Sequence, residues 1–420
     1  MTVATTGIRT ENLGSFAPGL NNRLPPTQLA RTLPDRSKAT FLSVGENIDL
    51  NGRGHMQRRR GTTLALSGAS AHSVWGDETE GYCAIGNDLL HLEPTPSGLL
   101  PTSVLSGLPE MAPISYARMP VGDVIWSNGH RIGRLRGTTA LPLATPRPVV
   151  VPTVSAIAGA LPAGRYQVAF TELGPLGESG STPPVALTLP ANSGIRITGL
   201  GADTVVYMTG ANGEVFNATA TDSGDIVALT NTGPELRSLL LADVPAGSIV
   251  RHYKGSLLVA AGTALLISEP YYYGLFSPSK GYIPFPAPIT VVQPCETGVF
   301  VCADRTYWLA GGLLDTTPVV VLPYGGLQGS GGEVRTPDGQ GTQQAFWLSP
   351  RGLVIGTPDG SATNVQENAL KFGPARAGAT LFREQDGAHH ILCARQEPAR
   401  PIGAAQGSFA VETIVKETDL

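Results

Sequence analysis

The sequence predicts an all-β protein: a β-propeller-like array of short antiparallel sheets with an inserted fibronectin- or immunoglobulin-like β-sandwich. Three observations predict this fold class. Glycine (52) and proline (35) make up about a fifth of the 420 residues, against roughly 12% in an average protein, which disfavours a mostly helical chain. Hydrophobic residues reach 41% while charged residues are only 15%, so the chain can bury a large core. Finally, one β-hairpin pattern recurs along the chain.

Each repeat is a short apolar strand, a polar turn and a second short apolar strand. Copies begin at Gly81, Gly122, Gly255, Gly298 and Gln344, and a weaker one begins at His389. Their spacing is 41 to 46 residues except for one interval of 133. A period in the forties is typical of propeller blades, which are four-stranded sheets. Sheets that are apolar on both faces bury them by covering one another. A β-sandwich array or another multi-sheet assembly is the alternative.

The order of the elements follows from these repeats. Residues 1–40 are rich in Thr, Asn, Pro and Arg without a sustained period, so we expect an extended arm. Residues 41–145 are expected to form the first blades. The long interval exceeds one period by about 90 residues, the size of a small β-sandwich, which we place at 146–240. Residues 241–398 continue the blades, and residues 399–420 form a tail or a closing strand.

Composition disfavours several classes of function. The net charge is −4, so the chain as a whole has no attraction for nucleic acid or anionic membranes. The first twenty residues lack an apolar run of signal-peptide length, so we expect no Sec-type secretion. The most apolar stretch, 141–161, contains four prolines and is not expected to span a membrane.

The cysteines give no sign of a metal site or of disulfides. Cys83, Cys295, Cys302 and Cys393 have no histidine near enough in sequence to complete a zinc-like set. Most lie inside apolar strand-like runs, where cysteine behaves as a small hydrophobic residue. We expect free thiols in a protein made in a reducing cytoplasm.

The segment 17–61 has a distinctive order of motifs. Asn21-Asn22 is followed by a predicted hairpin with Asn51-Gly52 at its tip, a type I′ turn signal, and then by Arg58-Arg59-Arg60-Gly61. This order resembles the amino-terminal signature of tail-tube nozzle proteins of short-tailed bacteriophages. The blade hairpins and the start of the insertion at Leu161 resemble phage structural proteins more weakly.

The resemblance implies a structural virion protein of the phage tail, not an enzyme, with no cofactor. It implies a homohexameric ring below the portal and its adaptor, through which viral double-stranded DNA passes, and on which tail fibres can dock. A mildly acidic protein does not grip phosphate strongly. The alternatives are a carbohydrate-binding or glycan-degrading propeller of a tail spike, and a tail-tip or baseplate component of a long-tailed phage.

Two groups of residues are candidates for an interface. Arg58, Arg59 and Arg60 contact either DNA in the channel or, with more weight, carboxylates of a neighbouring subunit or solvent. A second group lies in a connection between blades, where aromatic residues anchor interfaces or plug the core. Its members are Tyr271, Tyr272, Tyr273 and Phe276.

Signals of catalysis are few. Gly-x-Ser-x-Gly and His-Glu-x-x-His are both absent, and the glycine-rich stretch 326–332 lacks the lysine of a phosphate-binding loop. The carboxylate pairs Asp77–Glu78 and Glu172–Glu178 are the candidates for glycoside hydrolysis in the tail-spike alternative. His389-His390 point to opposite faces of a strand and make a poor metal pair. We therefore predict no catalytic, cofactor-binding or metal-binding residues.

Overall fold

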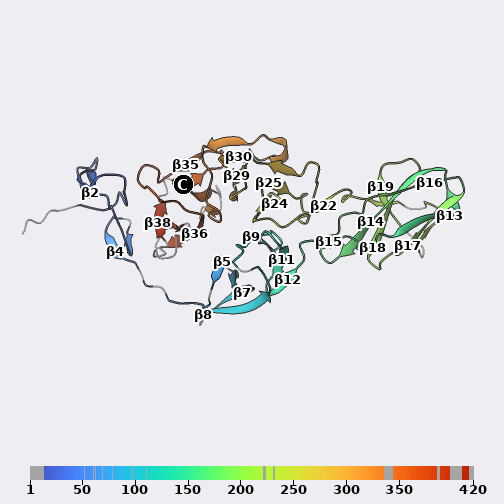
Figure 1. Ribbon diagram of the computed structural model, residues 1–420, viewed down its shortest axis with the longest axis horizontal. Coiled ribbons are helices and arrows are strands. Elements are labelled where there is room, and N and C mark those ends of the chain that lie inside the picture. The colour runs from blue at the N-terminus through green and yellow to red at the C-terminus, as the bar shows by residue number, and fades with distance from the viewer. Residues whose placement is uncertain are drawn as a thin grey trace, which may run out of the picture. The chain divides into compact units, whose positions relative to one another are not determined.

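The computed structural model describes residues 14–415 except 52, 60, 62, 69, 78, 97, 110, 221–223, 230–231, 335–343, 386–387 and 398–408. Within that part the protein is all-β, as predicted (Figure 1). The helices in the described residues are two 3-10 turns, η1 (Pro26–Gln28) and η2 (Leu313–Asp315). The chain divides into two compact units, unit 1 (Met1–Ser67 with Thr290–Leu420) and unit 2 (Gly68–Ile289). None of the helices described is long and apolar enough to cross a membrane.

Short antiparallel sheets, which we call blades A to F, form the propeller-like array. Unit 2 holds blades A, B and C. Blade A contains β5 (Ala71–Gly76), β6 (Gly81–Ile85), β7 (Asp88–Thr95) and β8 (Gly98–Leu105). Blade B contains β9 (Ser115–Arg118), β10 (Val124–Ser127), β11 (Ile132–Arg136) and β12 (Thr139–Leu141), and blade C contains β23 (Ile249–Tyr253), β24 (Ser256–Ala261), β25 (Ala264–Ile267) and β27 (Tyr282–Pro284). Unit 1 holds blades D, E and F. Blade D contains β28 (Val291–Pro294), β29 (Gly298–Cys302), β30 (Thr306–Ala310) and β31 (Val319–Leu322). Blade E contains β32 (Gly332–Val334), β33 (Gln344–Ser349), β34 (Gly352–Gly356) and β35 (Ala362–Asn364), and blade F contains β36 (Ala377–Gln385), β37 (Ala388–Gln396) and β38 (Phe409–Val415).

The predicted hairpins are the two central strands of blades A to E. They pair as β6–β7, β10–β11, β24–β25, β29–β30 and β33–β34. The weaker sixth repeat is β37, which pairs with β36 and β38. The strand predicted in the tail therefore exists as β38 and extends blade F. The hairpin pattern succeeds because two short apolar runs define the strands and the polar residues between them define the turn.

Within each unit the core lies between successive blades, as expected for sheets with two apolar faces. In blade E, Phe346 and Leu348 pack toward blade F, while Ala345 and Trp347 pack toward blade D. Residues that alternate along a strand thus belong to different clusters. In the same way, some buried residues of blade B form a cluster with blade A, and others form a cluster with blade C. First strands of neighbouring blades lie together: β9 with β23 in unit 2, and β28 and β36 with β32 in unit 1.

The insertion is a β-sandwich (green in Figure 1). One sheet contains β13 (Thr153–Leu161), β17 (Ser193–Thr198) and β20 (Asp225–Ile226). The other contains β14 (Gly164–Gly174), β15 (Gly177–Glu178), β16 (Val185–Leu189), β18 (Thr204–Thr209), β19 (Phe216–Thr219) and β21 (Thr232–Glu235). Buried residues of both sheets, including Tyr166, Phe170 and Ile195, form one cluster between them. The short pair β22 (Ala242–Asp243) and β26 (Leu275–Phe276) follows in the same unit.

The amino-terminal segment is less extended than predicted. Residues 1–13 lie outside the described part, but β1 (Ala30–Thr32) and β2 (Lys38–Thr40) form a hairpin. The turn closes because the Asp35 carboxylate accepts hydrogen bonds from the Ser37 amide (2.9 Å) and hydroxyl (2.6 Å). These bonds hold the pKa of Asp35 below its ordinary value. A second hairpin pairs β3 (Ile48–Leu50) with β4 (Met56–Arg58).

The loop of this second hairpin differs from the prediction. Leu50 pairs with Met56, so residues 51–55 form the loop instead of a two-residue Asn51-Gly52 turn, and Gly52 lies outside the described residues. The Asn51 side-chain oxygen accepts hydrogen bonds from the amides of Arg53 (3.0 Å) and His55 (2.9 Å). An asparagine that bonds backbone amides ahead of it stabilises such a longer loop.

The four cysteines are free and buried, as predicted. Burial raises the pKa of Cys295, Cys302 and Cys393 to about 12. These side chains are therefore neutral thiols at physiological pH and act as small core residues.

Candidate functional site

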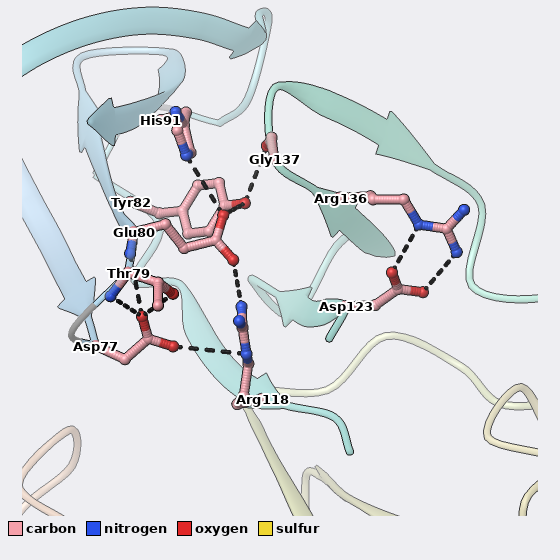
Figure 2. A network of polar contacts seen from close by, with 9 residues as sticks. All are labelled: Asp77, Thr79, Glu80, Tyr82, His91, Arg118, Asp123, Arg136 and Gly137. Carbon is pink, nitrogen blue, oxygen red and sulfur yellow. Dashed lines mark hydrogen bonds and ion pairs between the residues drawn. The ribbon is translucent and has the colours of Figure 1, made fainter. Parts of the chain in front are cut away.

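A network of polar side chains joins blades A and B, and we call this region the A–B joint (Figure 2). It starts in the loop between β5 and β6. The Asp77 carboxylate accepts hydrogen bonds from the Thr79 amide (2.8 Å), the Thr79 hydroxyl (2.7 Å) and the Glu80 amide (3.1 Å). Such an Asx turn fixes the loop. It places the Glu80 side chain against blade B.

Glu80 is the centre of the network. Its Oε2 accepts a hydrogen bond from the Tyr82 hydroxyl (2.8 Å) and lies 3.3 Å from His91 Nε2. Its Oε1 pairs with Nη1 of Arg118, the last residue of β9. Arg118 Nε lies 3.5 Å from Asp77 Oδ2. Two carboxylates of blade A therefore hold one guanidinium of blade B (Figure 2).

Tyr82 makes a second link between the blades. Its hydroxyl also lies 2.9 Å from the carbonyl oxygen of Gly137, in the turn between β11 and β12. The ring of Tyr82 is fully buried and stacks with those of Trp75 and Tyr116, with centroids 6.0 and 6.2 Å away. Burial, and then the hydrogen bond to the Glu80 carboxylate, raise the pKa of Tyr82 well above its ordinary value. The phenol is therefore a neutral donor.

A second cluster lies within blade B. Asp123 is 2% exposed and pairs with Arg136 through Nε (2.8 Å) and Nη2 (3.1 Å) and with Arg134 Nη1 (3.0 Å). Arg134 also donates to the Leu143 carbonyl oxygen (3.0 Å). Burial opposes ionisation of Asp123, but the two guanidiniums outweigh it and hold its pKa below the ordinary value.

The chemistry of the A–B joint is that of a structural contact. Some glycosidases use a tyrosine beside a carboxylate as nucleophile, and Tyr82 with Glu80 has this composition. However, Tyr82 has no exposed surface, so a glycan cannot reach its hydroxyl. Both Glu80 oxygens already have partners in the chain. The network therefore stabilises the contact of two blades.

The described carboxylates of the pairs suggested by the sequence accept hydrogen bonds from other groups of the chain. Asp77 is held in its turn, and Glu78 lies outside the described residues. In the sandwich, Glu178 accepts a hydrogen bond from Thr171 (2.6 Å) and Glu172 from Thr204 (2.8 Å). No group of His, Cys, Asp and Glu among the described residues is arranged to hold a metal ion.

The asparagine pair of the amino-terminal motif forms a second contact, which we call the Asn22 anchor. The Asn22 side chain donates to the Lys371 carbonyl oxygen (3.0 Å) and accepts from the Lys371 amide (2.7 Å). The Asn22 amide donates to the Ala369 oxygen (3.1 Å), and Arg23 Nε to the Leu370 oxygen (3.0 Å). Asn21 shapes the segment by accepting the amides of Arg23 and Leu24.

The arginine motif is only partly available to a partner. Arg59 Nε lies 3.0 Å from Asp49 Oδ1, so Arg59 forms a salt bridge within the hairpin, and its contact with a neighbouring subunit or with DNA stays a prediction. The pairing follows from the β3–β4 register, which places the two residues at the same end of the hairpin. Arg58 is exposed and stays a predicted contact. Arg60 lies outside the described residues.

The aromatic segment divides between core and surface. Tyr273 is 8% exposed and belongs to the cluster between blades B and C, and Phe276 packs against that cluster. Tyr272 is half-buried. The side chain of Tyr273 therefore fills the core, which is the plug that the sequence analysis gave as the alternative to an interface. Tyr271 is 78% exposed, and its role at an interface stays a prediction.

The sequence did not reveal the A–B joint. Glu80 and Arg118 are 38 residues apart, and Tyr82 and Gly137 are 55 apart. Each is an unremarkable loop or strand residue in its own segment. Assigning the blades would have pointed to Arg118. It is a charged residue at the end of the first strand of blade B, and that end lies beside a loop of blade A.

Comparisons with known proteins show likeness of fold only. No family model matches the chain, and no curated protein matches it. A crystal structure of BBS1N in complex with ARL6DN has 12% identity and a TM-score of 0.36, covering 84% of this chain and 95% of that one. The WD40 domain of Neurospora crassa Pan2 has 12% identity and a TM-score of 0.31, covering 77% and 86%. AztD from Citrobacter koseri has 10% identity and a TM-score of 0.27, covering 70% and 85%. Likeness at this level says nothing about what the chain binds.

Proposed function

We propose that this chain is a structural protein of a phage virion that forms a ring in the tail, below the portal and its adaptor. The ring is the conduit and seal for the viral DNA. The observation that carries the proposal is the A–B joint. There, Glu80, Arg118 and the fully buried Tyr82 hold two blades together. Charged side chains whose partners lie within the chain stabilise a rigid wall, whereas a reactive site needs groups that are open to a substrate.

The amino-terminal motif adds support. Its resemblance to nozzle proteins rests on the segment that contains Asn21 and Asn22, and Asn22 docks the segment on its own unit. The acidic balance of the chain, 33 acidic against 29 basic residues, suits a channel wall, because DNA passes a weakly binding surface with little retention.

Native mass spectrometry and class-averaged electron microscopy of the purified full chain test the proposal. We expect a closed ring, six copies by the family resemblance, with a central channel, that binds an isolated portal–adaptor complex. A chain that stays monomeric at all concentrations and does not bind that complex contradicts the proposal. Turnover of a cell-surface glycan by the purified chain favours the tail-spike alternative instead.

A further inference from the structure

Two connections join the inserted sandwich to the blades of its unit, and the first contains a stretch with few contacts. Residues 148–152 precede β13. Between two prolines they hold Val149, Val150 and Val151, which are 95%, 71% and 47% exposed. No hydrogen bond joins these three valines to another described residue. A stretch without such bonds changes its backbone angles at little cost, so the sandwich can turn here.

Directly before this stretch, the chain is held against the sandwich. The Thr145 hydroxyl donates to the Gly177 carbonyl oxygen of β15 (2.7 Å). Thr145 also lies beside Gly174, where an added Cβ would be 2.7 Å from the Thr145 hydroxyl oxygen. Arg147 lies beside Gly180 in the same way, with its Nε 2.7 Å from the position of an added Cβ. Gly174 and Gly180 therefore make room for the first connection on the sandwich.

Arg147 also reaches the second connection, which leads from the sandwich back to blade C. Its Nη2 donates to the Leu241 carbonyl oxygen, and its Nε lies 3.7 Å from Asp243 Oδ1. Asp243 belongs to β22, which pairs with β26 in a connection of blade C. One guanidinium thus contacts the sandwich and both of its connections.

These contacts hold Arg147 but leave one of its donors unsatisfied. The Nε atom is buried and makes no hydrogen bond with a described residue, because 3.7 Å is too long for one. The Asp243 side chain is 59% exposed, so water and salt weaken the ion pair. A buried donor without a partner is stabilised when water reaches it. Hydration of the guanidinium therefore partly offsets the loss of its contacts when it leaves this position.

We propose that Arg147 is a latch that fixes the sandwich on the blades, and that the sandwich turns about residues 148–152 when the latch opens. With the latch closed, the sandwich has one orientation. With the latch open, the two connections still tether the sandwich but no longer set its angle. The inference does not depend on the proposed ring, because all of these contacts lie within unit 2 of a single chain.

The distance between two spin labels on the full chain, measured by pulsed electron paramagnetic resonance, reports the orientation of the sandwich. Glu214→Cys places one label on the sandwich and Val121→Cys places the other on blade B, both at exposed positions. The four native cysteines are buried and add little background. We expect a narrow distance distribution with Arg147 present. With Arg147→Ala the distribution should be about twice as wide, because a hinge motion samples several orientations.

The matched control is Arg165→Ala. It removes the same charge from an exposed position of the sandwich, away from both connections, and should keep the narrow distribution. Arg147→Ala should leave the melting temperature almost unchanged, because Arg147 is not part of the sandwich core.

Gly180→Ala tests the latch from the side of the sandwich. The three atoms nearest to the added Cβ all belong to the Arg147 guanidinium, so alanine displaces it. The φ of Gly180 is outside the left-handed region, so the backbone accepts alanine. We expect the same widening as for Arg147→Ala, and no further widening when the two changes are combined, because both act on one contact. Asp243→Asn should widen the distribution less, and only at low salt.

The possible outcomes decide the inference. It is overturned if the distribution is already as wide with Arg147 present as with Arg147→Ala, because a closed state then does not exist. It is also overturned if Arg147→Ala and Gly180→Ala both keep the narrow distribution, or if their effects add in the double variant. If Arg147→Ala does not fold, the test depends on Gly180→Ala and Asp243→Asn, and an unchanged width in both overturns the inference. None of these results depends on whether the chain forms a ring.

Discussion

Blades A and B meet over three aromatic rings, and so do blades D and E, but the surroundings of the rings differ. The rings are Trp75, Tyr82 and Tyr116 at the A–B joint, and Phe300, Trp308 and Trp347 at the D–E joint. At the A–B joint the Tyr82 hydroxyl donates to the Glu80 carboxylate, which also pairs with the Arg118 guanidinium. At the D–E joint the rings meet glycine backbone instead.

The glycines show how the D–E joint is built. A Cβ at Gly356 would lie 2.4 Å from the Phe300 ring, and a Cβ at Gly360 would lie 2.7 Å from Trp308. Any side chain at either position would have to displace a ring. The comparison teaches that the same blade contact can depend on shape complementarity or on charge. The two joints should then respond differently to mutation, salt and pH.

The largest loss of stability is expected from Trp347→Ala, which removes one of the three rings packed at the D–E joint. Trp347 has no exposed surface, and loss of such a side chain costs about 3–5 kcal/mol. Urea unfolding followed by circular dichroism measures the loss, which should be the same in low and high salt. Trp347→Phe keeps part of the ring and should lose less. A salt-dependent loss would contradict an apolar joint.

Glu80→Ala tests the A–B joint and has a smaller expected effect. It leaves the Tyr82 hydroxyl with only the Gly137 oxygen as acceptor and Arg118 with only Asp77. The loss of a buried carboxylate that both groups share costs about 2 kcal/mol. The control is Asp225→Ala, which breaks a surface pair with Arg196 and should cost under about 1 kcal/mol. Equal losses from both variants would show that the A–B network is no more than a surface pair.

Acid should loosen blades A and B, where partners of opposite charge or hydrogen-bond donors hold carboxylates ionised. The pKa values of Asp77 and Asp123 lie below their ordinary range because hydrogen bonds and guanidiniums outweigh burial. A lowered pKa means that both carboxylates stabilise the fold above about pH 4, and that this contribution is lost as pH falls further. Hydrogen exchange at pH 5 and pH 3, corrected for intrinsic rates, should show β10 and β11 losing protection while β29 and β33 keep theirs. In Asp123→Asn the pH dependence of β10 and β11 should be smaller.

The sequence predicts the D–E joint better than the A–B joint. The unbroken apolar run of Ala345, Phe346, Trp347 and Leu348 predicts a strand that is apolar on both faces, and such a strand requires a blade on either side. No comparable pattern announces Glu80, because a carboxylate in a turn is common. Its partners also come from distant segments whose register depends on how the blades pack. Local turn chemistry was equally hidden at 51–55, where one asparagine side chain decides the loop length.

The Asn22 anchor offers a third kind of contact and the smallest expected effect. Asn22→Ala removes two hydrogen bonds to Lys371, both at the surface, and surface bonds of this kind contribute about 0.5–1.5 kcal/mol each. The loss should be local, because the blade cores do not depend on this segment. We therefore expect faster trypsin cleavage after Arg23 and Arg31 with little change in the melting temperature. Asn22→Asp keeps the acceptor for the Lys371 amide but loses the donor to its carbonyl oxygen, so its cleavage rate should be intermediate. If both variants are cleaved at the wild-type rate, contacts other than the Asn22 side chain hold the segment. The hydrogen bonds between Asn22 and Lys371 would then stabilise their contact less than the ion pairs stabilise the A–B joint or the packed rings stabilise the D–E joint.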